Sequence, residues 1–334
     1  MGISSGALRS IADRKHVRDV APARVAVLIA VAMAGLVSAG HPAFGGDGKG
    51  ATGALIASPA SHDCPKCPEW TVPQKPFKVY GNTYYVGTRE LASILVTSSE
   101  GHVLIDGTVG QAVPQVAANI RALGFRVEDI RWILNSHDHF DHAGGIAALK
   151  RMSGAKVAAS PPSAHVLSQG HSDPDDPLYG SLARGPEAIP DVRIIGDGDA
   201  ISAGPLKLTA HFTPGHTPGG TSWTWQSCEK DRCLHIVYAD SLSPVSSPSF
   251  KFTRSATYPR ALEDFAHSFE VLSALPCDIL LTPHPDFSDT LERLARREGG
   301  SDPDAFVDST ACRRYVEEAR ADLQKRVAQE GRPR

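Results

Sequence analysis

The sequence contains one dense cluster of metal-ligand side chains, the segment 136–142 with the sequence SHDHFDH. Imidazole and carboxylate groups are the donors that Zn²⁺ binds, besides cysteine. His137 and His139 lie two residues apart, and an extended chain places alternate side chains on one side, so both can bind one ion. Asp141 and His142 follow where the chain turns toward a predicted helix. This second pair can therefore serve a second ion.

Two further histidines stand in turns that follow predicted strands. His216 lies in the segment 213–220, TPGHTPGG, and His284 lies in the segment 281–285, LTPHP. A four-coordinate zinc needs ligands from more than one segment of the chain. Histidines in three turns at strand ends therefore indicate a shared metal cleft.

The elements that must position these turns alternate along the chain. A run of strands followed by helices occurs twice, which predicts two sheets packed face to face with helices outside. Strands are expected at 78–86, 91–97, 102–105, 131–134, 156–158, 192–195, 206–212, 221–226, 234–239 and 279–281, and helices at 111–123, 144–152, 163–168, 260–275 and 311–327.

Two long segments without periodicity, 171–190 and 244–257, separate these elements. Long irregular loops in a compact domain are usually functional. We expect both loops to shape a substrate groove, with Tyr179 as one of its lining residues.

The beginning of the chain has the layout of an export signal. Five basic residues precede the apolar run 25–37, which ends in Ser38-Ala39-Gly40. This run is shorter than the ~20 residues that a membrane-spanning helix needs. We therefore expect a signal peptide at 1–39 that is cleaved after Ala39, a flexible lead-in at 40–69 and a single domain at 70–330, secreted to the periplasm without stable membrane insertion. An uncleaved membrane anchor is the alternative.

Charge limits the kinds of partner. The chain has 34 Lys plus Arg against 37 Asp plus Glu, and its basic residues are scattered. Nucleic-acid binding depends on a basic face that neutralises phosphates. The composition therefore indicates no nucleic-acid partner, and we expect a monomer that acts on a small molecule.

All six cysteines follow the predicted signal peptide. An even number in an exported protein indicates disulfides, although six cysteines allow fifteen pairings. The spacing suggests three pairs, which are Cys64 with Cys67, Cys228 with Cys233, and Cys277 with Cys312. A redox dithiol or half of a zinc site is the alternative for the CPKC segment at 64–67.

Taken together, these motifs resemble the metallo-β-lactamase superfamily, and specifically the third subclass of class B β-lactamases. The resemblance is carried by SHDHFDH at 136–142, TPGHTPGG at 213–220, YADSLS at 238–243 and CDILLTPHP at 277–285. It extends from about Trp70 to the C-terminal helix. It implies an α/β fold, a four-layer αββα sandwich of two mixed sheets with helices outside, and it pairs Cys312 with Cys277.

The resemblance also implies residue roles. One zinc would be bound by His137, His139 and His216, and the other by Asp141, His142 and His284, with Asp141 also assigned to catalysis. Ser241 and Ser243 would bind the substrate carboxylate, and Ser241 stands where other class B enzymes have a cysteine ligand. Turn capping is the alternative role for both serines.

The implied activity is that of a zinc-dependent β-lactamase with two Zn²⁺ per subunit. A zinc-bound hydroxide would hydrolyse the β-lactam amide of penicillins, cephalosporins and carbapenems and so cause antibiotic resistance. Another hydrolase on this fold, a lactonase or thioesterase, is the first alternative. In relatives with other substrates an aspartate near Asp240 bridges both metals, and Asp138 could orient a histidine. A non-catalytic periplasmic zinc-binding protein is the second alternative.

Overall fold

The computed structural model of the protein describes residues 64–181 and 185–331. The predicted signal peptide at 1–39 and most of the predicted lead-in at 40–69 lie outside these ranges. Within them, residues 64–70 form a turn and the short helix α1 (Cys67–Trp70). None of the helices in the described ranges combines the length and the hydropathy that a membrane span requires.

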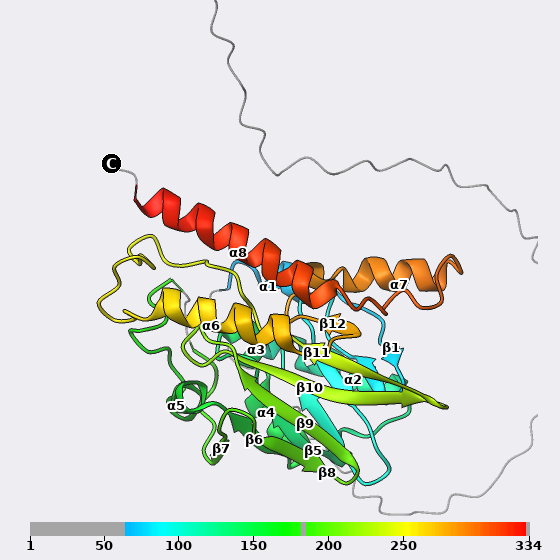
Figure 1. The fold of residues 1–334 in the computed structure, drawn as a ribbon. Helices are drawn as coiled ribbons and strands as arrows, with labels where there is room; N and C mark the ends of the chain where they lie inside the picture. The colour runs from blue at the N-terminus through cyan, green and yellow to red at the C-terminus, as the bar shows by residue number, and fades with distance from the viewer. Residues whose placement is uncertain (1–63, 182–184, 332–334) are drawn as a thin grey trace, which may run out of the picture. The chain divides into compact units, whose positions relative to one another are not determined.

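A seven-stranded mixed sheet forms the first half of the fold (Figure 1). Strands β1 to β4 pair antiparallel, and β4 to β7 pair parallel. The strands lie side by side in chain order, as β1 (Phe77–Tyr80), β2 (Thr83–Tyr85), β3 (Ile94–Val96), β4 (His102–Ile105), β5 (Ile130–Leu134), β6 (Lys156–Ala159) and β7 (Val192–Ile194).

A five-stranded mixed sheet forms the second half, in the order β12-β11-β10-β9-β8. Only β11 and β12 pair parallel, and the other pairs are antiparallel. The strands are β8 (Ala200–Ala203), β9 (Leu206–Phe212), β10 (Thr221–Glu229), β11 (Arg232–Tyr238) and β12 (Ile279–Leu281).

Three buried clusters show how the layers pack. The first lies between the two sheets and includes Tyr85, Trp223 and Tyr238. The second joins the seven-stranded sheet to α2 (Val113–Ala122), α4 (Ile146–Ser153) and α5 (Pro161–Gln169). The third joins the five-stranded sheet to α6 (Ala261–Ala274) and α8 (Ala311–Glu330), which run side by side (Figure 1). Two sheets face to face with helices outside confirm the predicted αββα sandwich.

The remaining helical elements have three or four residues each, apart from the nine-residue α7, whose Leu294 packs in the cluster between the sheets. They are α3 (Phe140–Ala143), α7 (Thr290–Glu298) and the 3₁₀ turns η1 (Gly110–Ala112), η2 (Val127–Asp129) and η3 (Pro285–Ser288). Strand β8 and helix α7 are absent from the sequence-based prediction. β8 has only four residues, of which Ile201 alone is large and apolar, and α7 is so rich in charge that few apolar positions mark its buried face.

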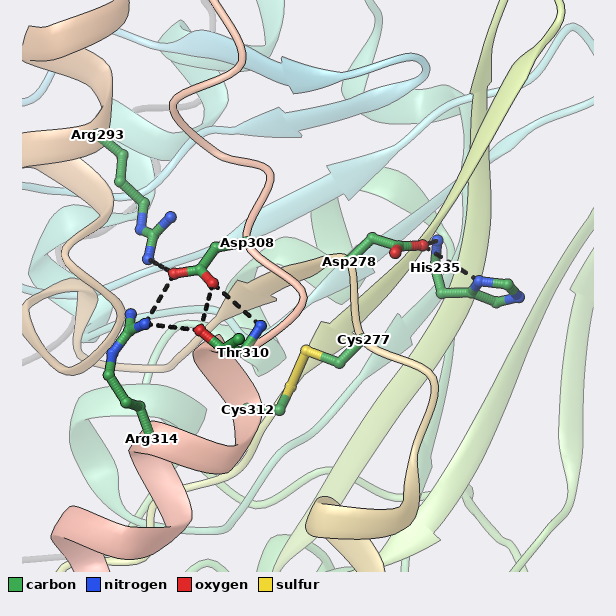
Figure 2. Close-up of a disulfide and its surroundings, with 8 residues drawn as sticks. All are labelled: His235, Cys277, Asp278, Arg293, Asp308, Thr310, Cys312 and Arg314. Atoms are coloured by element: carbon green, nitrogen blue, oxygen red, sulfur yellow. Dashed lines mark hydrogen bonds and ion pairs between the residues drawn. A yellow bond between two sulfur atoms is a disulfide. The ribbon is translucent and has the colours of Figure 1, made fainter. Parts of the chain in front are cut away.

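The three predicted cysteine pairs are present as disulfides: Cys64–Cys67, Cys228–Cys233 and Cys277–Cys312. The first two are local, and the second links opposed residues of β10 and β11. The third joins the chain just before β12 to the first turn of α8 (Figure 2). By the chain-entropy model, a disulfide that closes a loop of this length stabilises the fold by about 4 kcal/mol.

Asp308 anchors the start of α8 beside this disulfide (Figure 2). Its carboxylate accepts hydrogen bonds from Arg293 at 3.1 Å, from Arg314 at 2.9 Å, and from the amide and hydroxyl of Thr310 at 3.0 and 2.7 Å. Burial raises the pKa of Asp308, but the bonds from Thr310, Arg314 and Arg293 outweigh it and hold the pKa below its usual range. The Arg293 guanidinium is buried, so Asp308 supplies its counter-charge.

We expect Asp308→Asn to lower the free energy of unfolding of the metal-free protein by about 2 kcal/mol at pH 7, because hydrogen bonds to charged groups are lost. The pKa of Asp308 is depressed in the folded state, so its contribution is complete above the unfolded pKa of about 4 and decreases below it. The difference in unfolding free energy between Asp308→Asn and wild type should therefore be smaller at pH 3 than at pH 7. Urea unfolding at both pH values measures it.

Asp304→Asn is the matched control, because the Asp304–Arg232 ion pair is more than half exposed on average. Such a pair contributes about 0–1 kcal/mol. Equal losses in both variants, or a loss at Asp308 that does not change with pH, would contradict the anchoring role.

Candidate metal centre

Six ligand-type side chains from three strand-end turns converge in the structure. β5 leads into His137 and His139, and α3 carries Asp141 and His142. The turn between β9 and β10 supplies His216, and the residue before η3 is His284. These are all six of the metal ligands predicted from the sequence. They form two groups, which we call the tri-histidine group (His137, His139, His216) and the aspartate group (Asp141, His142, His284).

The tri-histidine group forms a nearly equilateral arrangement of rings. The centroids of His137, His139 and His216 lie 4.8 Å from one another in all three pairs, and the rings are close to perpendicular. The Nε2 atom of His137 is buried without a hydrogen-bond partner. An unpaired buried nitrogen is costly unless a ligand takes its lone pair. The group therefore fits a metal ion.

The donor atoms of the aspartate group lie close together. Asp141 Oδ2 lies 3.2 Å from His142 Nε2 and 3.3 Å from His284 Nε2, and the two Nε2 atoms lie 3.3 Å apart. Ligands about 2.0–2.1 Å from a tetrahedral zinc are separated by about 3.3–3.4 Å. The three donor atoms thus already have the spacing of one face of such a site.

The two groups adjoin each other through His137 and His142, whose ring centroids are 4.4 Å apart. Together they offer five imidazoles and one carboxylate, a donor set that suits zinc and other borderline transition metals. The residues present therefore fit a dinuclear metal site.

The segment after β11 orients two histidines of the tri-histidine group. Asp240 Oδ1 lies 2.8 Å from His137 Nδ1, and the carbonyl oxygen of Ser243 lies 2.7 Å from His216 Nδ1. A carbonyl oxygen can only accept, so His216 Nδ1 must donate, and the same holds for His137 Nδ1 when the Asp240 carboxyl, whose pKa burial raises, is ionised. The Nε2 lone pair of each ring is then left for a metal.

The ring of His139 has the opposite orientation, with Nε2 instead of Nδ1 in contact with its hydrogen-bond partner. Its Nε2 lies 3.1 Å from Asp176 Oδ1, which leaves Nδ1 toward the group. Burial lowers the pKa of His139, but the Asp176 carboxylate outweighs burial and raises this pKa to about 9. A ligating imidazole must be free of the second proton, so metal binding here displaces a proton.

Burial keeps the other two rings of the group neutral. It lowers the pKa of His137 well below its usual value and, reinforced by the neighbouring His139, lowers the pKa of His216 to about 3. In the aspartate group, burial raises the pKa of Asp141, but His142 and His284 hold it well below the usual range. At neutral pH His137 and His216 thus present imidazole lone pairs and Asp141 is ionised, whereas His139 must first lose a proton to bind a metal.

A buried carboxylate supports the turn that carries the first histidines. Asp106 accepts bonds from the amide and hydroxyl of Ser136 at 2.8 and 2.7 Å and from the hydroxyl of Tyr238 at 2.8 Å. The turn around His216 depends instead on Gly215, whose φ is +134°. A Cβ there would lie 2.7 Å from the Phe265 ring, so only glycine fits.

Three other residues considered in the sequence analysis lie outside the two ligand groups. Ser241 is buried with an unpaired hydroxyl, and Ser243 contributes its carbonyl oxygen to His216. Asp138 lies outside both groups and accepts a bond from Ser163 of α5 at 2.8 Å. Its pKa is raised by burial to about 6.

Tyr179 is half exposed and lines a hollow of about 350 Å³ between the two loops predicted to shape the groove. The amide of Ser247 in one loop donates to the carbonyl of Pro177 in the other at 2.8 Å. Asp176 also lines this hollow, so it connects the hollow with His139.

Asp176 is the residue that the sequence-based prediction missed. It stands in a loop with several other acidic residues and no motif, so nothing in the sequence marks its contact with a histidine 37 positions away.

Comparison with known proteins gives a consistent result. The family model described as the metallo-beta-lactamase superfamily matches residues 87–229. The solved structure of Rm3 metallo-beta-lactamase is 54% identical, covers 80% of this chain and 99% of its own, and has a TM-score of 0.79. MEM-A1, a subclass B3 metallo-beta-lactamase from a soil metagenome library, is 47% identical over 78% of this chain and 98% of its own, with a TM-score of 0.76.

Curated relatives match over shorter stretches. A hydroxyacylglutathione hydrolase of Anaeromyxobacter dehalogenans is 38% identical over 96 residues, which is 29% of each chain. Another from Maricaulis maris is 28% identical over 167 residues, 50% of this chain and 52% of its own. The chain therefore matches about half or less of the length of these two relatives.

We expect purified wild-type protein loaded with zinc to hold two zinc ions per chain. His216→Ala and His284→Ala should each reduce this to about one, because each removes a ligand from a different group. His211→Ala is the control, since His211 contacts Thr224 and belongs to neither group. Elemental analysis after dialysis measures the ratio, and an unchanged ratio in His216→Ala would contradict the assignment.

Proposed function

Because the chain belongs to the metallo-β-lactamase superfamily, we propose that it is a zinc-dependent β-lactamase of subclass B3 that acts on penicillins, cephalosporins and carbapenems. The observation that carries this proposal is the position of Asp240. Its carboxylate contacts Nδ1 of His137, the ring nitrogen on the side away from the tri-histidine group, and Asp240 is not one of the residues that could bridge the two groups. The next residue is the buried Ser241. A carboxylate that bridges both metals is instead expected in relatives with other substrates.

When bound, two zinc ions would polarise a carbonyl oxygen and lower the pKa of a coordinated water toward about 7, so that a hydroxide nucleophile is available at neutral pH. The protein's contribution is to hold the ligands rigidly. Asp240 and Ser243 keep the Nδ1 protons of His137 and His216 in place, and Asp176 does the same for Nε2 of His139.

Two groups of this chain are proposed to contact the substrate itself. The Ser241 hydroxyl is unpaired and adjoins Asp240, so it can donate a hydrogen bond to the carboxylate that β-lactams carry. Lys251 lines the hollow between the two loops and adds a positive charge on the same side as Asp176. In the hydrolysis itself, water adds to the amide carbon, the ring C–N bond breaks, and the nitrogen takes up a proton.

A thioesterase is the second candidate. It is supported by the curated relatives, which carry the name hydroxyacylglutathione hydrolase. Their matches cover about half of their length or less, whereas the subclass B3 structure is covered almost completely. The β-lactamase is therefore the better-supported proposal.

We propose that the enzyme is exported to the periplasm as a monomer and contributes to antibiotic resistance there. The support is the signal-like segment at 1–39 and the presence of three disulfides, which persist in oxidising compartments.

We expect the purified, zinc-loaded protein to hydrolyse nitrocefin and a carbapenem. Prolonged chelation should abolish this activity and added Zn²⁺ should restore it, because the nucleophile depends on the metal. A spectrophotometric assay measures both steps, with a lactone and an acylglutathione thioester tested in parallel. Turnover of either without turnover of any β-lactam would reject the proposed substrate class.

We expect Ser241→Ala to raise KM for β-lactams by about tenfold, because a hydrogen bond to a charged group contributes about 1.5–3 kcal/mol. The change in kcat should be small, since this bond forms equally in the bound substrate and the transition state. Ser202→Ala on the exposed face of β8 is the control. Steady-state kinetics measure both constants, and a loss confined to kcat would indicate a different role for Ser241.

A further inference from the structure

The position of two metal-ligand candidates depends on a segment that is not part of any sheet. Asp240 and Ser243 orient His137 and His216, yet β11 already ends at Tyr238. The amide of Ala239 still donates to Leu281 at 2.9 Å. No strand is assigned to the residues that follow Ala239 up to residue 247. Their buried peptide groups must therefore find other partners.

The hydroxyl of Tyr315 is the partner of two of these peptide groups. Tyr315 donates to the carbonyl oxygen of Asp240 at 2.9 Å and accepts from the amide of Leu242 at 2.9 Å. These two backbone groups flank Ser241. The hydroxyl of Ser222 anchors the same segment, because it accepts from the amide of Asp240 at 2.9 Å.

Tyr315 itself is held in a fixed position. It is buried in the cluster that joins the five-stranded sheet to α6 and α8. It follows Cys312 by three residues on α8, and the Cys277–Cys312 disulfide ties this turn of the helix to β12. Figure 2 shows the Asp308 cluster at the start of the same helix. The hydroxyl thus has little freedom to move relative to the sheet.

The same side chain also approaches the aspartate group. The Phe287 ring lies 6.2 Å from the Tyr315 ring and 6.0 Å from the His284 ring, centroid to centroid. Tyr315 is therefore one residue away from ligands of both groups without contacting either group directly.

We propose that Tyr315 is a positioning residue of the metal centre. Its hydroxyl fixes the segment Asp240–Ser243, and this segment holds His137 and His216 with their Nε2 atoms toward the metal. The proposal rests on the part of the proposed function that makes the two groups metal sites, and it does not depend on the substrate.

Tyr315→Phe tests the proposal, because it removes the hydroxyl and keeps the ring. We expect the zinc affinity of the full-length protein to fall about tenfold, the lower end of what the loss of an outer hydrogen-bond partner produces. Competition between the protein and a chromophoric chelator for Zn²⁺ measures this affinity without any substrate. The absorption spectrum of the Co²⁺-loaded protein should change as well, since ligand orientation changes.

Tyr80→Phe is the matched control. The Tyr80 hydroxyl is also part of a largely buried side chain and donates to a carbonyl, that of Arg232, but it contacts no segment that orients a ligand. We expect both variants to lose some stability in the metal-free state, whereas only Tyr315→Phe should lose zinc affinity. Equal zinc affinity in Tyr315→Phe, Tyr80→Phe and wild type would overturn the proposal.

Ser222→Ala provides a second test that keeps α8 unchanged if Tyr315→Phe does not fold. It removes the other anchor of Asp240, so zinc affinity should fall in the same direction, and an unchanged affinity would count against the proposal. It also removes the bond between the Ser222 and Thr213 hydroxyls at 2.8 Å, so an unchanged affinity is its decisive outcome. Failure of the proposed function would look different. Wild type that binds two zinc ions but hydrolyses no β-lactam would refute the substrate class and leave the role of Tyr315 intact.

Discussion

An imidazole has two ring nitrogens, and a buried histidine can direct only one of them to a metal, so the other must find a hydrogen-bond partner. The candidate centre meets this constraint at every histidine except His142, whose Nδ1 is buried without a partner. Four of its five histidines have such a partner on the ring nitrogen away from the group: Asp240 for His137, Asp176 for His139, the Ser243 carbonyl for His216 and the Glu90 carbonyl for His284. These partners select the tautomer, and burial keeps the tri-histidine rings His137 and His216 neutral.

The groups that hydrogen-bond to the ligand histidines lie in irregular segments, whereas the ligands themselves lie in turns at strand ends. The sandwich explains this division. Strands β5, β9 and β12 end close together, which brings the ligand-bearing turns to one place. The loops that continue beyond the sheets then cover the ligands from behind. Asp176 shows the consequence, because it contacts His139 and also lines the hollow between the two long loops. The loop that orients His139 thus also lines this hollow.

The C-terminal helix α8 also supports the ligands, through the contact of Tyr315 with the segment that holds His137 and His216. The Cys277–Cys312 disulfide and the Asp308 cluster fix the start of α8, and Tyr315 extends from it to the segment that holds two ligands. The stability of the outer layer and the geometry of the centre therefore depend on common contacts. A chain of this length can form its core without a disulfide, but the Cys277–Cys312 bond ties down the helix that carries Tyr315.

The sequence by itself determined the ligand types, their division among three turns, the two-sheet architecture and the two local cysteine pairs, because these follow from local spacing and from alternating strand and helix patterns. The pairing of Cys277 with Cys312, 35 positions apart, was implied by the family resemblance. The sequence-based prediction missed β8 and α7, whose few apolar residues leave a weak pattern. Only the tertiary structure decided which ring nitrogen each histidine directs to the site, that Asp240 lies behind His137, and that Asp176 and Tyr315 take part. The physical reason is distance along the chain: the contacts that orient the ligands join residues up to 103 positions apart in the sequence for His137 and 37 for His139, and no local pattern encodes a pairing that only packing creates.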